Sequence, residues 1–290
     1  MKILRKIIAI SLILAVTIAA LTYDAFFSAP KRFTVRYETL SSIYIPEQMN
    51  DISVLYFSDL DYGAFMDSAR LSRLVTAING LSPDIVVFGG DLVADEVTVM
   101  DEAMKKEIST GLKRINAPLG KFAVMGDADR KDVTLTKRVE EALYDGEFEL
   151  LNNRSISLRN QGSQAIVLVG VDNGVNGYAD ITTAFANVSR TSYAIAVCHT
   201  PDTAAQFPTD LTKYALAGHS HGGQAYWGFG ALYTPPGATT YIRGKYTVNG
   251  AFTLDITNGT GTEIRDVRFL ANAEIVLYRL EHRSITDTSK

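Results

Sequence analysis

The sequence predicts an α/β protein built on two adjoining sheets, and three observations support this. In the first half of the chain, apolar runs typical of strands alternate with segments whose apolar residues recur at helical spacing. After residue 148, strand-like runs follow one another, which predicts a second sheet packed beside the first. Several runs end in an acidic residue or a histidine, which predicts that functional side chains gather at one edge of the sheets.

The first half supplies one edge strand and three βα units. The edge strand is expected over residues 32–45, and buried strands are predicted at 52–57, 84–88 and 121–125. Continuous apolar runs of this length are typical of strands covered on both faces. A helix follows each of the three buried strands. Their apolar faces are formed by Leu71, Leu74, Val75 and Ile78, by Met104, Ile108, Leu112 and Ile115, and by Leu135, Val139 and Leu143.

The second half is rich in strands. Short helices are expected near 181–188 and after the turn at Pro201. The predicted strands cover residues 148–151, 155–158, 165–171, 193–198, 214–217, 251–256 and 273–280.

The N-terminus has the pattern of a membrane anchor or a signal peptide. Three of the first six residues are basic, and residues 7–21 carry no charge. We favour an uncleaved anchor because the small-residue pattern Thr17-Ile18-Ala19 lies inside the apolar run. The predicted organisation is an anchor or signal at residues 1–30 and a domain at 32–284. By the positive-inside rule the domain of an anchored, single-pass chain is extracytoplasmic, and a domain secreted after cleavage is the alternative.

Composition excludes some classes of protein. Hydrophobic residues make up 47% of the chain, enough for a sizeable core, and the net charge of −4 gives no reason to expect a nucleic-acid partner. A single cysteine excludes an internal disulfide framework and a cysteine-rich zinc site.

Five predicted strands end at their carboxyl side in groups that bind metals. Carboxylates and neutral imidazoles are good ligands for divalent ions. Ligand sites of open α/β sheets lie at the carboxyl ends of strands, so these side chains are predicted to converge on one rim. The candidate ligands are Asp59, Asp61, Asp91, Asp127, His199, His219 and His221.

The set and its order resemble the calcineurin-like metallophosphoesterases, which carry D-x-H, G-D, G-N-H-D/E, a lone H and G-H-x-H. The motifs here read Asp59-Leu60-Asp61, Gly90-Asp91, Gly126-Asp127-Ala128-Asp129, His199 and Gly218-His219-Ser220-His221. The resemblance covers nearly the whole chain after residue 32. Residues 218–224 and the tail from 259 to 275 are similar to the bacterial, membrane-associated branch with G-H-T-H-G-G-Q.

The resemblance implies a four-layer α/β/β/α sandwich of two mixed sheets flanked by helices, with two divalent metal ions. The implied ligands of the first ion are Asp59, Asp61, Asp91 and His221. The implied ligands of the second ion are Asp91, Asp127, His199 and His219, so that Asp91 bridges the two. The implied reaction is hydrolysis of a phosphoester by a metal-bridging hydroxide.

The chain departs from the family pattern at four positions. Asp61 replaces a histidine and Asp127 an asparagine, which predicts an oxygen-rich site that favours manganese, iron or magnesium over zinc. Ala128 stands at the position of the family's catalytic histidine, and Ala94 at that of its supporting aspartate. The loss of this pair removes general acid–base help worth roughly 10²–10⁴-fold, so no catalytic side chain is assigned.

Two functions follow as hypotheses. The first is a membrane-tethered, metal-dependent phosphoesterase that hydrolyses a phosphodiester or pyrophosphate of a phosphorylated small molecule or lipid, such as a lipid- or sugar-linked substrate. The alternative is a catalytically impaired pseudoenzyme that binds metal and a phosphate ligand. Tyr226, Trp227 and Phe229 either line a lipid or sugar pocket or pack at the core and its rim. The substrate, the metal and the oligomeric state remain open.

Overall fold

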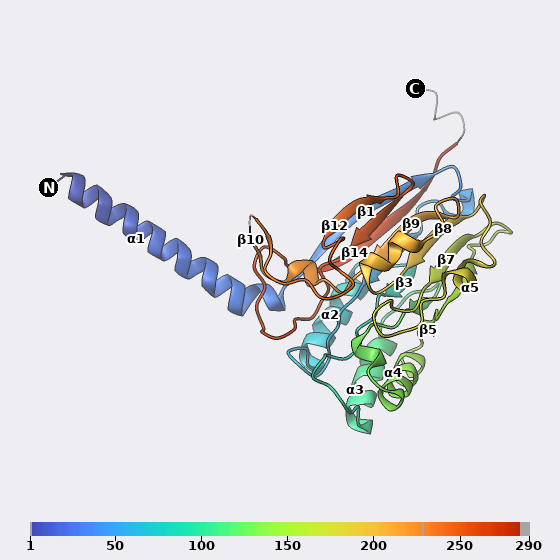
Figure 1. Cartoon of the computed structure of the whole chain (residues 1–290), viewed down its shortest axis with the longest axis horizontal. Coiled ribbons are helices and arrows are strands. Elements are labelled where there is room, and N and C mark those ends of the chain that lie inside the picture. Colours follow the sequence, from blue (N-terminus) through green and yellow to red (C-terminus); the bar gives the residue numbers. More distant parts are fainter. Residues whose placement is uncertain (1, 228, 285–290) are drawn as a thin grey trace.

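The computed structural model describes residues 2–227 and 229–284 and arranges the domain in four layers (Figure 1). The longer helices are α1 (Lys2–Tyr23), α2 (Ser68–Gly80), α3 (Glu102–Lys113), α4 (Val133–Asp145) and α5 (Ile181–Phe185). The short helical segments are η1 (Asp24–Ser28), η2 (Ala29–Lys31), η3 (Glu47–Met49), η4 (Ala128–Arg130), η5 (Pro201–Gln206) and η6 (His221–Gly223).

Two six-stranded sheets form the middle layers. The first has the order β1 (Phe33–Ser42), β14 (Ala273–His282), β2 (Ser53–Phe57), β3 (Ile85–Phe88), β4 (Lys121–Ala123) and β5 (Glu149–Leu150). The second has the order β12 (Gly244–Val248), β13 (Phe252–Ile256), β9 (Thr212–Ala217), β8 (Tyr193–Val197), β7 (Ile166–Gly170) and β6 (Arg154–Leu158). A two-stranded ribbon of β10 (Tyr226–Trp227) and β11 (Gly230–Ala231) lies outside both.

Each sheet combines parallel and antiparallel strands. Strands β2, β3, β4 and β5 run parallel, while β14 is antiparallel to β2. In the second sheet β7, β8, β9 and β13 run parallel, with β6 and β12 antiparallel at the two edges. The carboxyl ends of the central strands of each sheet therefore lie along one edge of that sheet. The predicted fold of two mixed sheets flanked by helices is confirmed.

Three apolar layers hold the sandwich together. The first packs α2, α3 and α4 on the outer face of the first sheet, through residues such as Leu71, Leu112 and Val139. The second lies between the two sheets, and the third lies between the second sheet and α5 with η5. Each of the first three domain helices begins at an aspartate, since Asp67, Asp101 and Asp132 accept a backbone N–H of the first turn.

A buried carboxylate links the two sheets. Asp255 on β13 is fully buried and accepts two hydrogen bonds of 2.9 Å from Arg36 on β1. It also accepts the hydroxyls of Tyr214 on β9, at 3.0 Å, and Tyr278 on β14, at 2.7 Å. The charge is therefore paired and hydrogen-bonded, as burial requires.

The N-terminal helix stands away from the domain (Figure 1). None of its 22 residues is buried, so α1 is not a core helix. Within residues 2–31 an 18-residue window has a mean hydropathy of 2.2, and α1 alone measures about 33 Å at 1.5 Å per residue. This matches the roughly 30 Å hydrocarbon core of a bilayer. By length and composition α1 is able to cross a membrane.

Candidate metal centre

All seven predicted ligands lie at one rim, linked by contacts of 4.0 Å or less between their polar atoms. Asp59, Asp91 and Asp127 follow β2, β3 and β4 of the first sheet. His199 and His219 follow β8 and β9 of the second. The site is thus built across the junction of the two sheets, where the carboxyl ends of their parallel strands meet.

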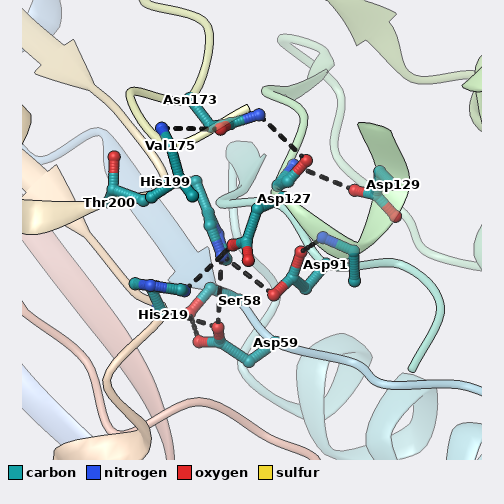
Figure 2. A network of polar contacts seen from close by, with 12 residues as sticks. Ser58, Asp59, Asp91, Asp127, Asp129, Asn173, Val175, His199, Thr200 and His219 are labelled. Carbon is teal, nitrogen blue, oxygen red and sulfur yellow. Dashed lines mark hydrogen bonds and ion pairs between the residues drawn. The ribbon is translucent and has the colours of Figure 1, made fainter. Parts of the chain in front are cut away.

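The candidate ligands of the second implied ion, here called the second group, are Asp91, Asp127, His199 and His219, whose ligand atoms lie within 4.8 Å of one another. His199 Nε2 lies 2.9 Å from Asp91 Oδ2 and 3.2 Å from Asp127 Oδ1. His219 Nδ1 lies 3.0 Å from the same Asp127 oxygen. Figure 2 shows His199 pointing into the space between these carboxylates. The four side chains are those assigned to the second ion by the family resemblance.

The candidate ligands of the first implied ion, here called the first group, include a residue that sequence reasoning missed. Asp61, His221 and Glu263 form a cluster of ligand atoms within 4.8 Å. His221 Nε2 lies 3.7 Å from Asp61 Oδ2 and 3.6 Å from Glu263 Oε1. Asp59 lies between the groups, since its Oδ1 is 4.0 Å from both His199 Nε2 and His221 Nε2.

The donor atoms fit a cation better than they fit one another. Both carboxylate oxygens of Asp61 and both ring nitrogens of His221 are buried and make no hydrogen bond to the part of the chain that the structure describes. Asp127 Oδ1 and His199 Nε2 are also buried and make no hydrogen bond within the described residues, although they lie close to each other. A buried polar atom without a partner is costly. Six such atoms, spread over the two ligand groups, are an arrangement that bound ions would satisfy.

Outer contacts orient two of the imidazoles. His199 Nδ1 donates a hydrogen bond of 2.8 Å to the Gly89 carbonyl, which leaves the Nε2 lone pair facing the carboxylates. His219 Nε2 donates to the Pro236 carbonyl at 2.8 Å, which leaves Nδ1 facing Asp127. A hydrogen bond from the distal nitrogen to a carbonyl is the usual support of a metal-binding histidine, because it fixes the tautomer and the ring.

The backbone at the site is strained. Non-glycine residues seldom adopt a positive φ, which costs of order 1–3 kcal/mol where the surroundings impose it. Five of the seven predicted ligands do so, and such outliers gather at functional sites. Their φ values are 54° at Asp59, 52° at Asp61, 55° at Asp91, 68° at His219 and 50° at His221.

The pKa values of the candidate ligands are shifted by burial and by their mutual contacts. Burial raises the pKa of Asp61 well above its usual value and that of Asp91 to about 7. Burial alone would lower the pKa of His221, but Asp61 and Glu263 outweigh it and raise that pKa to about 10. Burial likewise opposes ionisation of Asp127, yet hydrogen bonds and charge from His199 and His219 hold its pKa below the usual range. Burial and mutual contacts thus shift the pKa values of carboxylates and imidazoles strongly at this site.

The loop between β13 and β14 wraps closely around the first group. A Cβ at Gly261 would meet Asp61 Oδ2 at 2.4 Å, and one at Gly259 would meet Asp59 Oδ2 at 2.7 Å. Only glycine allows such an approach. Arg268 is fully buried and donates hydrogen bonds to the carbonyls of both glycines and of Ala271.

Gln224 fixes the position of Glu263. Its side-chain oxygen accepts the Glu263 backbone N–H at 2.8 Å, and its amide donates to the Glu263 carbonyl at 2.9 Å. The last residue of the Gly218–Gln224 motif therefore places the carboxylate beside His221. This contact and the Arg268 contacts were not foreseeable from local sequence.

Ala128 and Ala94 are both buried. The Ala128 N–H donates to Asp91 Oδ1 at 2.9 Å, but its methyl group has no proton to give. Asp129 accepts the backbone N–H groups of Leu92, Val93 and Gly126, so it supports the loops rather than facing the ligands (Figure 2).

Comparison with known proteins points to one family. The chain is 27% identical over 244 residues to the uncharacterized metallophosphoesterase YkuE of Bacillus subtilis (strain 168), covering 84% of each chain. It is 26% identical over 252 residues to a transmembrane protein with metallophosphoesterase domain of Danio rerio, covering 80% of this chain and 53% of that one. The chain is related to the metallophosphoesterases.

A third relative of this metallophosphoesterase group has a named activity. It is the UDP-2,3-diacylglucosamine pyrophosphatase LpxG of Chlamydia muridarum (strain MoPn / Nigg), 24% identical over 225 residues, or 61% of this chain and 65% of that one. No protein-family model matches the chain. The resemblance inferred from the motifs is confirmed by these metallophosphoesterase relatives.

Proposed function

We propose that the protein is a membrane-tethered, metal-dependent phosphoesterase that hydrolyses a phosphodiester or pyrophosphate. The observation that carries this proposal is the pair of ligand groups at the rim, whose buried donor atoms lack hydrogen-bond partners. Kinship with metallophosphoesterases supports the reaction class. The exposed apolar helix α1 supports the tether, with the domain on the extracytoplasmic side.

The ligand groups match two divalent ions. Asp91, Asp127, His199 and His219 would hold one ion, and Asp61, His221 and Glu263 the other. Asp59 lies near both groups, and we keep Asp91 as the expected bridge. Five carboxylates and three imidazoles make an oxygen-rich set, which favours manganese, iron or magnesium over zinc.

The chain's own residues orient the candidate ligands, and none is assigned to transfer a proton. When bound, paired divalent ions make water a nucleophile at neutral pH and neutralise charge that develops on the phosphoryl oxygens. The Gly89 and Pro236 carbonyls hold the imidazoles in the tautomers required for this. Ala128 has no acid to protonate the leaving group, so the reaction is expected to favour leaving groups that depart as anions.

Hydrolysis of an aryl phosphodiester by the purified full chain tests the proposal. We expect activity to depend on added divalent metal and to be lost in Asp91→Ala, which removes a candidate ligand. Glu281→Gln, a change at an exposed position, serves as the control and should retain activity. Equal activity of Asp91→Ala and the unaltered chain would refute the proposal.

The second candidate is a binding module without turnover, favoured by the joint presence of alanine at positions 94 and 128. A series of phosphodiesters with leaving groups of increasing pKa separates the two functions. A hydrolase without a general acid should cleave aryl esters and lose rate steeply on alkyl esters. A binding module should bind metal and phosphate and cleave neither.

A further inference from the structure

We propose that an apolar rim beside the metal centre rests in the interfacial layer of the membrane that α1 enters, so that the site takes phosphorylated lipids from the bilayer. The inference about substrate rests on the proposed function, whereas the contact with the bilayer does not. The apolar rim consists of Trp227, Phe229, Leu232, Tyr233, Ile264 and Leu270.

The domain has a very short connection to α1. Ala25, Ala29 and Pro30, which follow α1 directly, are buried against the domain. The Arg268 N–H donates to the Ala25 carbonyl at 3.0 Å, which joins the start of the domain to the loop between β13 and β14. Whatever α1 enters must therefore lie next to that loop. A bilayer spanned by α1 would begin within a few residues of it.

The apolar rim is continuous with this attachment point. The Tyr226 N–H donates to the Phe269 carbonyl at 2.8 Å, and the rings of Trp227 and Phe269 lie 5.1 Å apart. Arg243 donates to the Leu270 carbonyl and its guanidinium lies 4.4 Å from the centre of the Tyr226 ring. Figure 1 shows β10 next to the end of α1 where the domain begins.

The side chains of the apolar rim are exposed and of types that occur at membrane–water interfaces. Phe229 is completely exposed, Leu232 is 68% exposed and Ile264 is 66% exposed. Trp227 and Tyr233 are also exposed, and aromatic residues of these types concentrate at membrane–water interfaces. Arg265 beside Ile264 is exposed as well and carries a charge that anionic headgroups attract.

A cavity of about 300 Å³ connects the rim to the metal centre. Leu232, Tyr233 and Ile264 line one part of it, and His221 and Glu263 line another. A lipid whose chains remain in the bilayer would pass its phosphate along this cavity to the first ligand group. The apolar part of the lining gives the contact a role beyond anchoring, since α1 alone would provide attachment.

The single tryptophan of the chain, Trp227, reports on the rim without any added label. The full chain would be reconstituted in vesicles of phosphatidylcholine and phosphatidylglycerol, with or without lipids brominated near the headgroup end of the acyl chains. We expect the emission to be blue-shifted relative to the denatured chain and most of it to be quenched by the brominated lipid. Acrylamide in the aqueous phase should quench it weakly.

Two results would overturn the contact. Strong quenching by acrylamide with none by brominated lipid would put the rim in water. Protection from both quenchers, together with chemical cross-linking between chains, would mean that a second copy covers the rim. Phe229→Asp should reduce the quenching by brominated lipid, while Val133→Asp, an 87% exposed position on α4 far from α1, should not (Figure 1).

A kinetic comparison tests the lipid substrate separately. If the chain hydrolyses an aryl phosphodiester, Phe229→Asp should leave kcat and KM for that soluble ester unchanged and raise KM for a phospholipid presented in vesicles. Equal KM values for the vesicle substrate would refute the lipid inference. Absence of any hydrolysis would refute the proposed function and leave the quenching result to decide the bilayer contact.

Discussion

Glu263 offers the sharpest test of the metal centre, because neither the motifs nor the family resemblance requires it. The substitution Glu263→Gln keeps the size of the side chain and removes its charge. The backbone at this position is held by Gln224 through two hydrogen bonds, so the loop should keep its path. The change therefore addresses one candidate ligand, 3.6 Å from His221 Nε2, and little else.

A lower limit can be set on the loss of metal affinity that we expect in Glu263→Gln. Mutating a group that merely supports a ligand typically costs 10–100-fold in metal affinity. Loss of a charged ligand should cost at least as much, or about 1.4–2.8 kcal/mol of binding free energy. The affinity at the other group, which contains Asp127, should change much less, because Glu263 is not one of its members.

Two measurements are needed. Elemental analysis after dialysis against buffered manganese should give two ions per chain for the unaltered protein and one for Glu263→Gln at concentrations between the two affinities. In thermal unfolding, an ion at 100 times its Kd adds about 2.7 kcal/mol of stability. A 10- to 100-fold weaker site would add only about 1.4 to 0.4 kcal/mol at the same concentration.

Glu281→Gln is the matched control, since it makes the same chemical change at an exposed position on β14. It should bind two ions with unaltered affinity. Equal stoichiometry and affinity in Glu263→Gln and the unaltered chain would show that Glu263 is not a ligand. Its contact with His221 would then be a salt bridge only.

Three further substitutions test the surroundings. Asp255→Asn breaks the buried link between the sheets and should lower the free energy of unfolding by about 3 kcal/mol, measured by urea denaturation in detergent. Gly261→Ala adds a Cβ that would lie 2.4 Å from Asp61 Oδ2 and should lower metal occupancy at the first group, measured by elemental analysis. Arg70→Met removes the ion pair that ties α2 to Asp266 and should weaken metal binding at the first group while sparing the second, measured by calorimetric titration.

Much of the candidate metal centre could be predicted because its residues follow a local rule. Asp59, Asp91 and His199 each stand directly after an apolar run, and such runs are recognisable from a few neighbouring residues. Parallel strands present their carboxyl ends at one edge of a sheet, which brings Asp59 and Asp91 together on the first sheet and places His199 at the corresponding edge of the second. The contacts of Asp127 with His199 and His219 form where the edges of the two sheets meet.

Glu263 and Arg268 could not be found in this way. Both belong to a loop of irregular structure whose path depends on tertiary contacts with Ser58 and Asp59, which follow β2, and with Gln224. One signal was available, since the loop follows the strand predicted at 251–256, and that strand pairs in parallel with β9. Its carboxyl end therefore lies on the same edge as His219. The direction of β13 is a property of the sheet, and the chain's local pattern does not contain it.

The change at Asp61 and the presence of Glu263 are physically coupled. A histidine in the first motif, as in the family pattern, would need space on the side where Gly261 approaches Asp61 closely. The shorter aspartate fits beside the close approach of Gly261, in the same loop that carries Glu263, whose carboxylate lies 3.6 Å from His221 Nε2. Asp61 alone would be a weaker replacement for an imidazole ligand, since it must face His221 from 3.7 Å. The two carboxylates together supply the −2 charge that neutralises one divalent ion. The altered motif is therefore better understood as a different ligand set than as a damaged one, which favours a working metal centre even though Ala128 limits the acid–base chemistry around it.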